Sequence, residues 1–182
     1  MQIPFDPPFS RNDNFLGRES ELQAIHDNPT HQRRTKRTKL AMYALTGTGG
    51  IGKTQLALEY AYQHETGYSA IFWVHGASAS DMDLGFLNIM QAIVDQQAKI
   101  TWPNGSPDYQ IIGSKLGLLD CLAQDGSISN NPSHTKRINQ AVHRWLSLPE
   151  NSNWLFIFDN VDDLKSFKFE TTFLNIVKEG GF

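Results

Sequence analysis

Cysteine is almost missing from this sequence of 182 residues, in which Cys121 is the single example. One cysteine cannot form a disulfide within the chain, and this suits a reducing compartment. Long apolar runs are missing too, because the longest, 40–45, 70–74 and 154–158, have five or six residues each and a membrane helix needs roughly 20. The Pro-rich start, residues 1–9, also lacks the apolar stretch of a secretion signal. We therefore expect a cytoplasmic chain with no membrane partner.

An excess of positive charge is absent as well. Lysine and arginine number 16 against 19 aspartates and glutamates, for a net charge of −3 at pH 7, which argues against a protein that coats nucleic acid. Five of the basic residues nevertheless fall between Arg33 and Lys39. That cluster fits a nuclear-targeting signal, a phosphate-binding patch or a solvated loop. We favour the loop, because no aromatic side chains alternate with the charges as they do in surfaces that stack bases.

Zinc-binding and nucleophile patterns are missing too. The six histidines include no pair at H-E-x-x-H spacing, and with one cysteine they supply no zinc set. We expect them to be ordinary surface or loop residues. Cys121 stands in the apolar stretch GLLDCLA, so we expect a small core residue there.

What the sequence does contain is an alternation of helical and strand-like segments. Residues 1–14, with three prolines, are expected to form an arm or linker before the domain of residues 15–182. Apolar positions three and four apart predict helices, with Asp81 as the cap of one and Leu122 near the end of another. The helical patterns begin near residues 19, 53, 81, 109, 138 and 171, and the strand-like runs are 40–45, 70–74 and 154–158. This order predicts an α/β fold with a parallel sheet.

The strongest chemical signal is a phosphate-binding loop. The segment GTGGIGKT, residues 47–54, matches G-x-x-x-x-G-K-[ST] between a predicted strand and a predicted helix. Glycines allow the backbone to wrap phosphates with its N–H groups, and the helix that follows directs its positive end at the same phosphates. Lys53 would add a charge for the β and γ phosphates, and the Thr54 hydroxyl could bind Mg²⁺. The residues expected to bind nucleotide here are Gly47, Thr48, Gly49, Gly50, Ile51, Gly52, Lys53, Thr54 and Gln55.

A phosphate loop needs a carboxylate that holds the metal, and Asp159 fits this role. It directly follows the apolar run 154–158, so it would stand at the end of a buried strand and hold Mg²⁺ beside Thr54. Asn160 follows, where many hydrolytic proteins carry a second acid. An amide can position water but cannot take its proton, and Asp162 and Asp163 lie past the strand end. We therefore expect nucleotide binding with slow hydrolysis, and we expect Lys53 and Asp159 to be the catalytic residues.

The preferred base follows by elimination. Guanine-specific phosphate-loop proteins use an N-K-x-D or T-K-x-D segment, and neither occurs here. D-x-x-G is absent too. Adenine, as ADP or ATP, is therefore favoured.

Four segments together resemble the NB-ARC domain, the nucleotide switch of the STAND class of NTPases. The resemblance covers nearly the whole chain from about Phe5 and is closest to fungal intracellular receptor proteins that place NB-ARC before repeats. Its segments are FLGRE at 15–19, GTGGIGKTQLALEYA at 47–61, IFWV at 71–74 and WLFIFDNVDD at 154–163.

The resemblance implies roles for three further residues and a mechanism. Phe15 and Leu16 would contact the adenine, and Arg18 would lie near the nucleotide, although a surface ion pair of Arg18 with Glu21 or Glu19 remains an alternative. Family members rest in a closed, ADP-bound form, open on exchange to ATP and then self-associate through neighbouring domains. Such a switch needs two states of different nucleotide affinity. The implied partners are therefore the adenine nucleotide, other domains of a larger receptor and further copies of the chain.

The chain departs from this family mainly by stopping early. The three-layer phosphate-loop NTPase sandwich would continue after Asp159 into a strand with a sensor arginine and further helical domains, whereas this sequence ends at Phe182. We therefore expect a sheet that is incomplete toward the C-terminus. The alternative function is a truncated fragment that only binds partners or does not fold stably alone. A fast ATP-driven enzyme is disfavoured by Asn160 and by the lack of any substrate-site motif.

Overall fold

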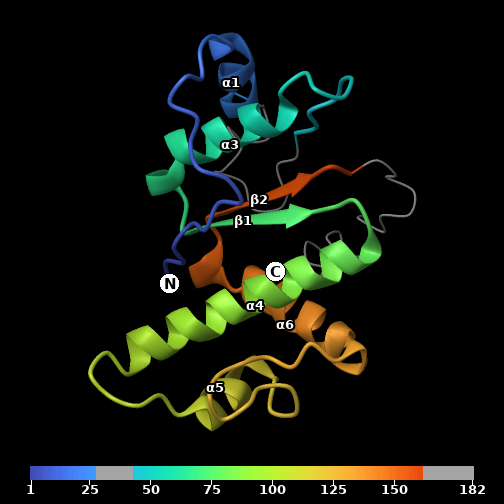
Figure 1. Ribbon diagram of the computed structural model, residues 1–182. Helices are drawn as coiled ribbons and strands as arrows, with labels where there is room; N and C mark the ends of the chain where they lie inside the picture. Colours follow the sequence, from blue (N-terminus) through green and yellow to red (C-terminus); the bar gives the residue numbers. More distant parts are fainter. Residues whose placement is uncertain (28–42, 162–182) are drawn as a thin grey trace.

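The computed structural model describes residues 1–27 and 43–161, in which two parallel strands lie between layers of helices (Figure 1). The strands are β1, Ala70–His75, and β2, Trp154–Asp159. On one face lie α1, Glu19–His26, and α3, Lys53–Gln63; on the other lie α4, Ala79–Thr101, and α6, Thr135–Ser147, with α5, Tyr109–Leu116, beyond them. Short 3₁₀ turns occupy Glu65–Gly67, Pro132–His134 and Pro149–Asn151. The predicted α/β fold with a parallel sheet is confirmed, and the sheet is small.

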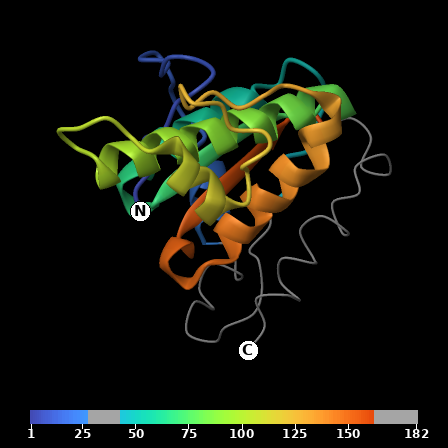
Figure 2. The ribbon, with the colours of Figure 1, turned by 90° about the horizontal axis from the view of Figure 1, so that it is seen from below.

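Both central strands are built from aromatic and β-branched residues that suit a pleated, buried surface. Their register pairs Ala70 with Trp154 and His75 with Asp159. The amide of Gly76 extends the ladder by donating to the carbonyl of Asp159 at 2.7 Å. Parallel neighbours require a long crossover connection, which α4, α5 and α6 provide (Figure 2). Asp159 therefore lies at the carboxyl edge of the sheet, where ligands bind in open α/β folds.

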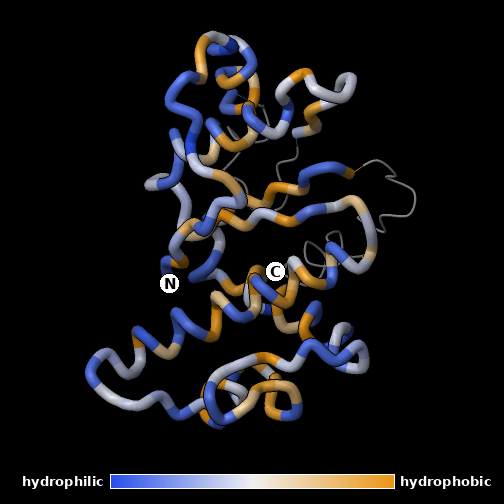
Figure 3. Tube along the Cα trace, in the orientation of Figure 1, coloured by the Kyte–Doolittle hydropathy of each residue, from blue (hydrophilic) through white to orange (hydrophobic). Residues whose placement is uncertain are grey.

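Side chains of β1 alternate between two apolar clusters on opposite faces of the sheet. Phe72 and Val74 point into the larger cluster, shared with α4, α5 and α6, whereas Ile71 belongs to the smaller one, shared with α1 and α3. The apolar residues follow the strands and the inner helix faces in Figure 3. Cys121 is buried in the larger cluster, as predicted. Burial raises the pKa of its thiol because the charged thiolate is poorly solvated there.

The helix α4 begins differently from the prediction. Asp81 is not its cap; Ser78 is, because its Oγ accepts a hydrogen bond from the amide of Asp81 at 3.1 Å. The hydroxyl of Ser78 in turn donates to Oδ2 of Asp81 at 2.6 Å. The Ser78 side chain thereby satisfies one of the unpaired amide groups at the start of the helix. The cap therefore lies three residues before the predicted one.

The helix near residue 109 is shorter than predicted. It ends at Leu116 because Gly117 takes a left-handed conformation, φ 73°, and closes the helix with hydrogen bonds to Gly113 and Ser114. Such a glycine commonly ends a helix. Residues up to Leu122 continue as turns, and Leu122 pairs with Ile128 in an isolated antiparallel bridge.

The strand predicted at 40–45 is not present in its described part. Tyr43, Ala44 and Leu45 have no strand conformation, and Tyr43 is 48% exposed. A strand exists only when its backbone pairs with a neighbour, and in the described chain β1 and β2 pair with each other alone. Residues 40–42 lie outside the described residues, as do the basic cluster Arg33 to Lys39, the pair Asp162 and Asp163, and the helix predicted near 171.

Candidate functional site

The loop at residues 47–52 leads directly into the first turn of α3. Gly50 and Gly52 have left-handed backbones, with φ of 79° and 84°, which glycine adopts without the Cβ clash of other residues. A Cβ at Gly49 or Gly50 would meet nothing within 4 Å, so the outer side of the loop is open. The sequence prediction that α3 begins at Lys53 is confirmed.

The side chain of Lys53 lies over this loop. Its ammonium donates to the carbonyl oxygens of Gly47 at 2.8 Å and Thr48 at 3.0 Å. These contacts hold the positive charge beside the loop. A cation held there can attract a phosphate at short range.

The loop amides are available for an anion. Within the described chain, no hydrogen bond leads from the amide N–H groups of Thr48 to Lys53 to another residue. The first turn of α3 contains no acidic residue, so nothing there offsets the positive end of the helix. Exposed N–H groups, an open loop and a lysine fit the phosphates of a nucleotide.

Thr54 and Asp159 come together at this site. The Thr54 hydroxyl donates to Oδ1 of Asp159 at 2.9 Å, across 105 residues of sequence. Thr54 is placed by the first turn of α3 and Asp159 by the end of β2. After Asp159 the chain turns at Asn160, whose φ of 60° is unusual for a residue other than glycine.

The pair Thr54 and Asp159 has the chemistry of a magnesium site. A hydroxyl and a carboxylate are the hard oxygen ligands that Mg²⁺ prefers, and Mg²⁺ keeps several waters and binds phosphates rather than a full protein cage. Among the described residues no group of three or more His, Cys, Asp or Glu could hold a metal ion. Two protein oxygens beside a phosphate loop therefore fit the type of magnesium site that relies on its ligand.

Arg18 contacts both an acidic side chain and the phosphate loop. Its Nε donates to Oε1 of Glu21 at 3.1 Å, which is the ion pair that the sequence offered as the alternative, and the nearness of Arg18 to a nucleotide stays a prediction. Its Nη1 also donates to the carbonyls of Ile51 at 3.0 Å and Gly52 at 3.2 Å. A hydrogen bond from Ser20, and next the bond from Arg18, lower the pKa of Glu21. Arg18 thus ties the residues before α1 to the phosphate loop.

The two residues predicted to contact adenine, Phe15 and Leu16, differ in their exposure to solvent. Phe15 is half-buried and packs against the smaller apolar cluster. Leu16 is 88% exposed. Gln55 lies in the first turn of α3 and is half-buried. Phe15 and Gln55 therefore lie at α3, and the role of all three residues toward a nucleotide stays a prediction.

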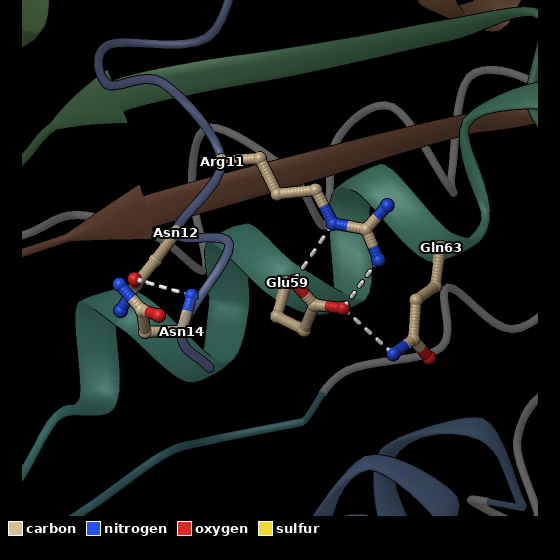
Figure 4. A network of polar contacts seen from close by, with 5 residues as sticks. All are labelled: Arg11, Asn12, Asn14, Glu59 and Gln63. Atoms are coloured by element: carbon tan, nitrogen blue, oxygen red, sulfur yellow. Dashed lines mark hydrogen bonds and ion pairs between the residues drawn. The ribbon is translucent and has the colours of Figure 1, made fainter. Parts of the chain in front are cut away.

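Sequence reasoning missed an ion pair that Figure 4 shows from close by. Arg11 reaches Glu59 on α3 with two bonds, from Nε to Oε2 at 3.1 Å and from Nη2 to Oε1 at 2.7 Å. Gln63 donates to the same carboxylate at 2.8 Å. The Arg11 hydrogen bond holds the pKa of Glu59 below its usual value, against burial, which raises it. The available signal was an acid within the apolar run LALEYAY of a helix.

Comparison with known proteins gives one informative match. No family model matches the chain, and no solved structure matches it. A curated protein of Hyaloscypha variabilis, named nucleotide-binding leucine-rich repeat (NLR)-like protein, is 26% identical over 164 residues. The chain is thus similar, at a low level of identity, to one NLR-like protein. The match covers 89% of the chain but 13% of the NLR-like protein, so the chain corresponds to a small part of that relative.

Proposed function

We propose that this chain is an adenine-nucleotide-binding module of the NB-ARC type, belonging to a signalling NTPase of the NLR-like kind. The observation that carries the proposal is the hydrogen bond between Thr54 and Asp159 beside the loop of residues 47–52. The similarity to an NLR-like protein supports a related signalling role at a coarse level. No helix of the described residues has the length and apolar character to cross a membrane.

Different residues of the chain would bind the phosphates and the metal ion. Amides of residues 48–53 and the ammonium of Lys53 would hold the phosphates, and Arg18 would keep the loop in place through its carbonyls. Thr54 and Asp159 would hold Mg²⁺, directly or through water. Bound Mg²⁺ would neutralise negative charge on the β and γ phosphates.

Hydrolysis by this site would be slow. Asp159 accepts a hydrogen bond from Thr54. The next residue, Asn160, lies past the end of β2 and has an amide that cannot accept a proton. A slow site suits a switch, whose two states must persist long enough to pass a signal. We propose ADP and ATP as the ligands because the guanine-recognition segments are absent from the sequence.

The partners of such a switch would lie outside this chain. The matched relative is far longer than this chain, so other domains of a larger receptor, and copies of it, are the proposed partners. Nucleic acid is disfavoured by the net charge of −3.

The direct test measures nucleotide binding to the purified chain by calorimetry, with ADP and Mg²⁺. We expect binding by the unmutated chain and a loss of at least about tenfold in Lys53→Ala, because a charge-assisted hydrogen bond contributes roughly 1.5–3 kcal/mol. Lys99→Ala, in the last turn of α4, is the matched control and should bind normally. Equal affinity of both variants would contradict the assignment of the phosphate loop.

A second candidate is a non-catalytic interaction module, and the two-stranded sheet of the described residues favours it. Two strands are a small sheet for an independently stable domain. Nucleotide released by denaturing the purified chain separates the candidates. ADP or ATP in the released material supports the switch, and its absence together with non-cooperative urea unfolding supports the interaction module.

A further inference from the structure

Residues 1–14, the N-terminal arm, lie along α3 and β1 rather than standing away from the domain. Ile3 is 4% exposed, and its amide donates to the carbonyl of Ser69 at 2.8 Å, just before β1. The ring of Phe5 meets Tyr62 edge to face, with centroids 5.6 Å apart. The Tyr62 hydroxyl donates to the carbonyl of Phe9 at 3.1 Å. The arm is therefore attached at successive points before it reaches Arg11.

Arg11 provides the strongest of these attachments. Glu59 is only 6% exposed, and a buried carboxylate is stable only when its oxygens are paired. Arg11 supplies two of the three bonds that the carboxylate accepts, in the two-pronged geometry that fixes both direction and distance. Removing Arg11 would leave a buried charge with Gln63 alone.

The same helix carries the phosphate-binding residues. Glu59 stands six residues after Lys53 on α3, about 9 Å along the helix axis at 1.5 Å per residue. A helix transmits position over that distance because its backbone is rigid. The arm is thus fixed to the body that places Lys53 and Thr54.

The segment between Arg11 and Arg18 is short, and hydrogen bonds within it fix its conformation. The amide of Asn14 donates to the side chain of Asn12 at 3.0 Å, and the amide of Phe15 donates to the carbonyl of Asn12 at 2.9 Å. Arg18 then bonds the carbonyls of Ile51 and Gly52. Two arginines therefore fix both ends of this segment on one helix and its preceding loop.

We propose that Arg11 and Glu59 are positioning residues for the nucleotide site: their ion pair holds the segment of residues 12–18 in place, so that Arg18 can brace the phosphate loop. This inference rests on the proposed function. Without the pair, the segment and Arg18 would sample several positions, and ordering them would have to accompany nucleotide binding. Affinity would fall although no residue that contacts the phosphates had changed.

The test is the dissociation constant for ADP with Mg²⁺, measured by calorimetry on the whole chain for Arg11→Gln and Glu59→Gln. We expect about a three- to tenfold rise in each. Arg11→Lys keeps the charge but not the two-pronged contact, so it should lie between Arg11→Gln and the unmutated chain. The exchange variant, Arg11→Glu with Glu59→Arg, should restore most of the affinity. Arg137→Gln removes a different, exposed ion pair, with Asp120, on the opposite side of the sheet and should not change the dissociation constant.

The outcomes distinguish this inference from the proposed function. Unchanged ADP affinity in both Arg11→Gln and Glu59→Gln would overturn the positioning role and leave the proposed function intact. The same role is overturned if the exchange variant recovers thermal stability but not affinity, since the pair would then be structural only. No ADP binding by the unmutated chain would overturn the proposed function and this inference with it.

Discussion

The hydroxyl of Thr54 and the carboxylate of Asp159 are 2.9 Å apart, although one begins a helix and the other ends a strand. Parallel strands have their carboxyl ends at the same edge of the sheet, and the first turn of α3 lies at that edge because it follows the phosphate loop. The fold therefore brings these two groups together. The contact places a hydroxyl beside a carboxylate, and the described residues contain no larger group of acids, histidines or cysteines that could hold a metal ion.

Thr54→Val should weaken the part of ATP binding that depends on Mg²⁺. Valine keeps the branched shape of threonine but has no oxygen for the ion, whereas Thr54→Ser keeps the oxygen and is the matched control. We expect the gain in ATP affinity on adding Mg²⁺ to fall by about tenfold in Thr54→Val and to be nearly normal in Thr54→Ser. Calorimetry with and without Mg²⁺ measures this, and an equal Mg²⁺ effect in both variants would refute the metal site.

Gly52→Ala should destabilise the chain even without nucleotide. Gly52 has φ 84°, and a Cβ there would lie 3.1 Å from Nη1 of Arg18. A left-handed alanine costs roughly 1–2 kcal/mol, and displacing Arg18 adds to that. Urea unfolding should show this loss, while Gly67→Ala, where a Cβ meets nothing within 4 Å, should be much milder. A Gly52→Ala variant as stable as Gly67→Ala would show that the loop relaxes freely.

Ile93→Ala should be among the more damaging changes in α4. Ile93 is fully buried in the larger apolar cluster, whereas Ile100, on the same helix, is 53% exposed. Truncating the buried residue should cost about 2–5 kcal/mol, and Ile100→Ala should stay within about 0.5 kcal/mol. Urea midpoints compare the two, and a reversed order would mean that the core lies elsewhere.

The Arg11–Glu59 pair should make stability depend on pH in the acid range. Folding lowers the pKa of Glu59 from its ordinary value of 4.5, first through the Arg11 hydrogen bond. A lowered carboxyl pKa stabilises the folded state above the ordinary value, and this stability is lost as pH falls through the folded pKa. The stability gap between the unmutated chain and Glu59→Gln should therefore stay constant above about pH 5 and shrink as the pH falls below the ordinary value of 4.5. A gap that stays constant below that value would argue against the ionised pair.

Local sequence patterns predicted the elements that carry the site. The runs at 70–74 and 154–158 are apolar throughout and contain aromatic or branched residues, so both strands were predicted to within one residue of their ends. The start of α3 at Lys53 follows from the phosphate-loop motif, because its glycines cannot continue a helix backward.

The features that were predicted wrongly or not predicted depend on the folded chain and not on the local sequence pattern alone. Ser78 and Asp81 can both cap a helix, and the choice depends on which backbone conformation the preceding chain adopts. Gly113 is tolerated inside α5, since Leu119 and Leu122 pack against it, whereas Gly117 ends the helix. Arg11 and Glu59 are 48 residues apart, and only the folded path of the arm brings them into contact.

The two apolar clusters on either side of the sheet differ in size, and this difference should affect how readily each side opens. Among the described residues, the side with α4 and α6 buries far more apolar surface than the side with α1 and α3. Regions with fewer buried contacts open at lower free energy and exchange their amide hydrogens sooner. We expect local opening, measured by hydrogen exchange, to be more frequent in α1 and α3 than in α4 and α6. Such opening would let a ligand enter and leave the phosphate-loop side without unfolding of the whole molecule.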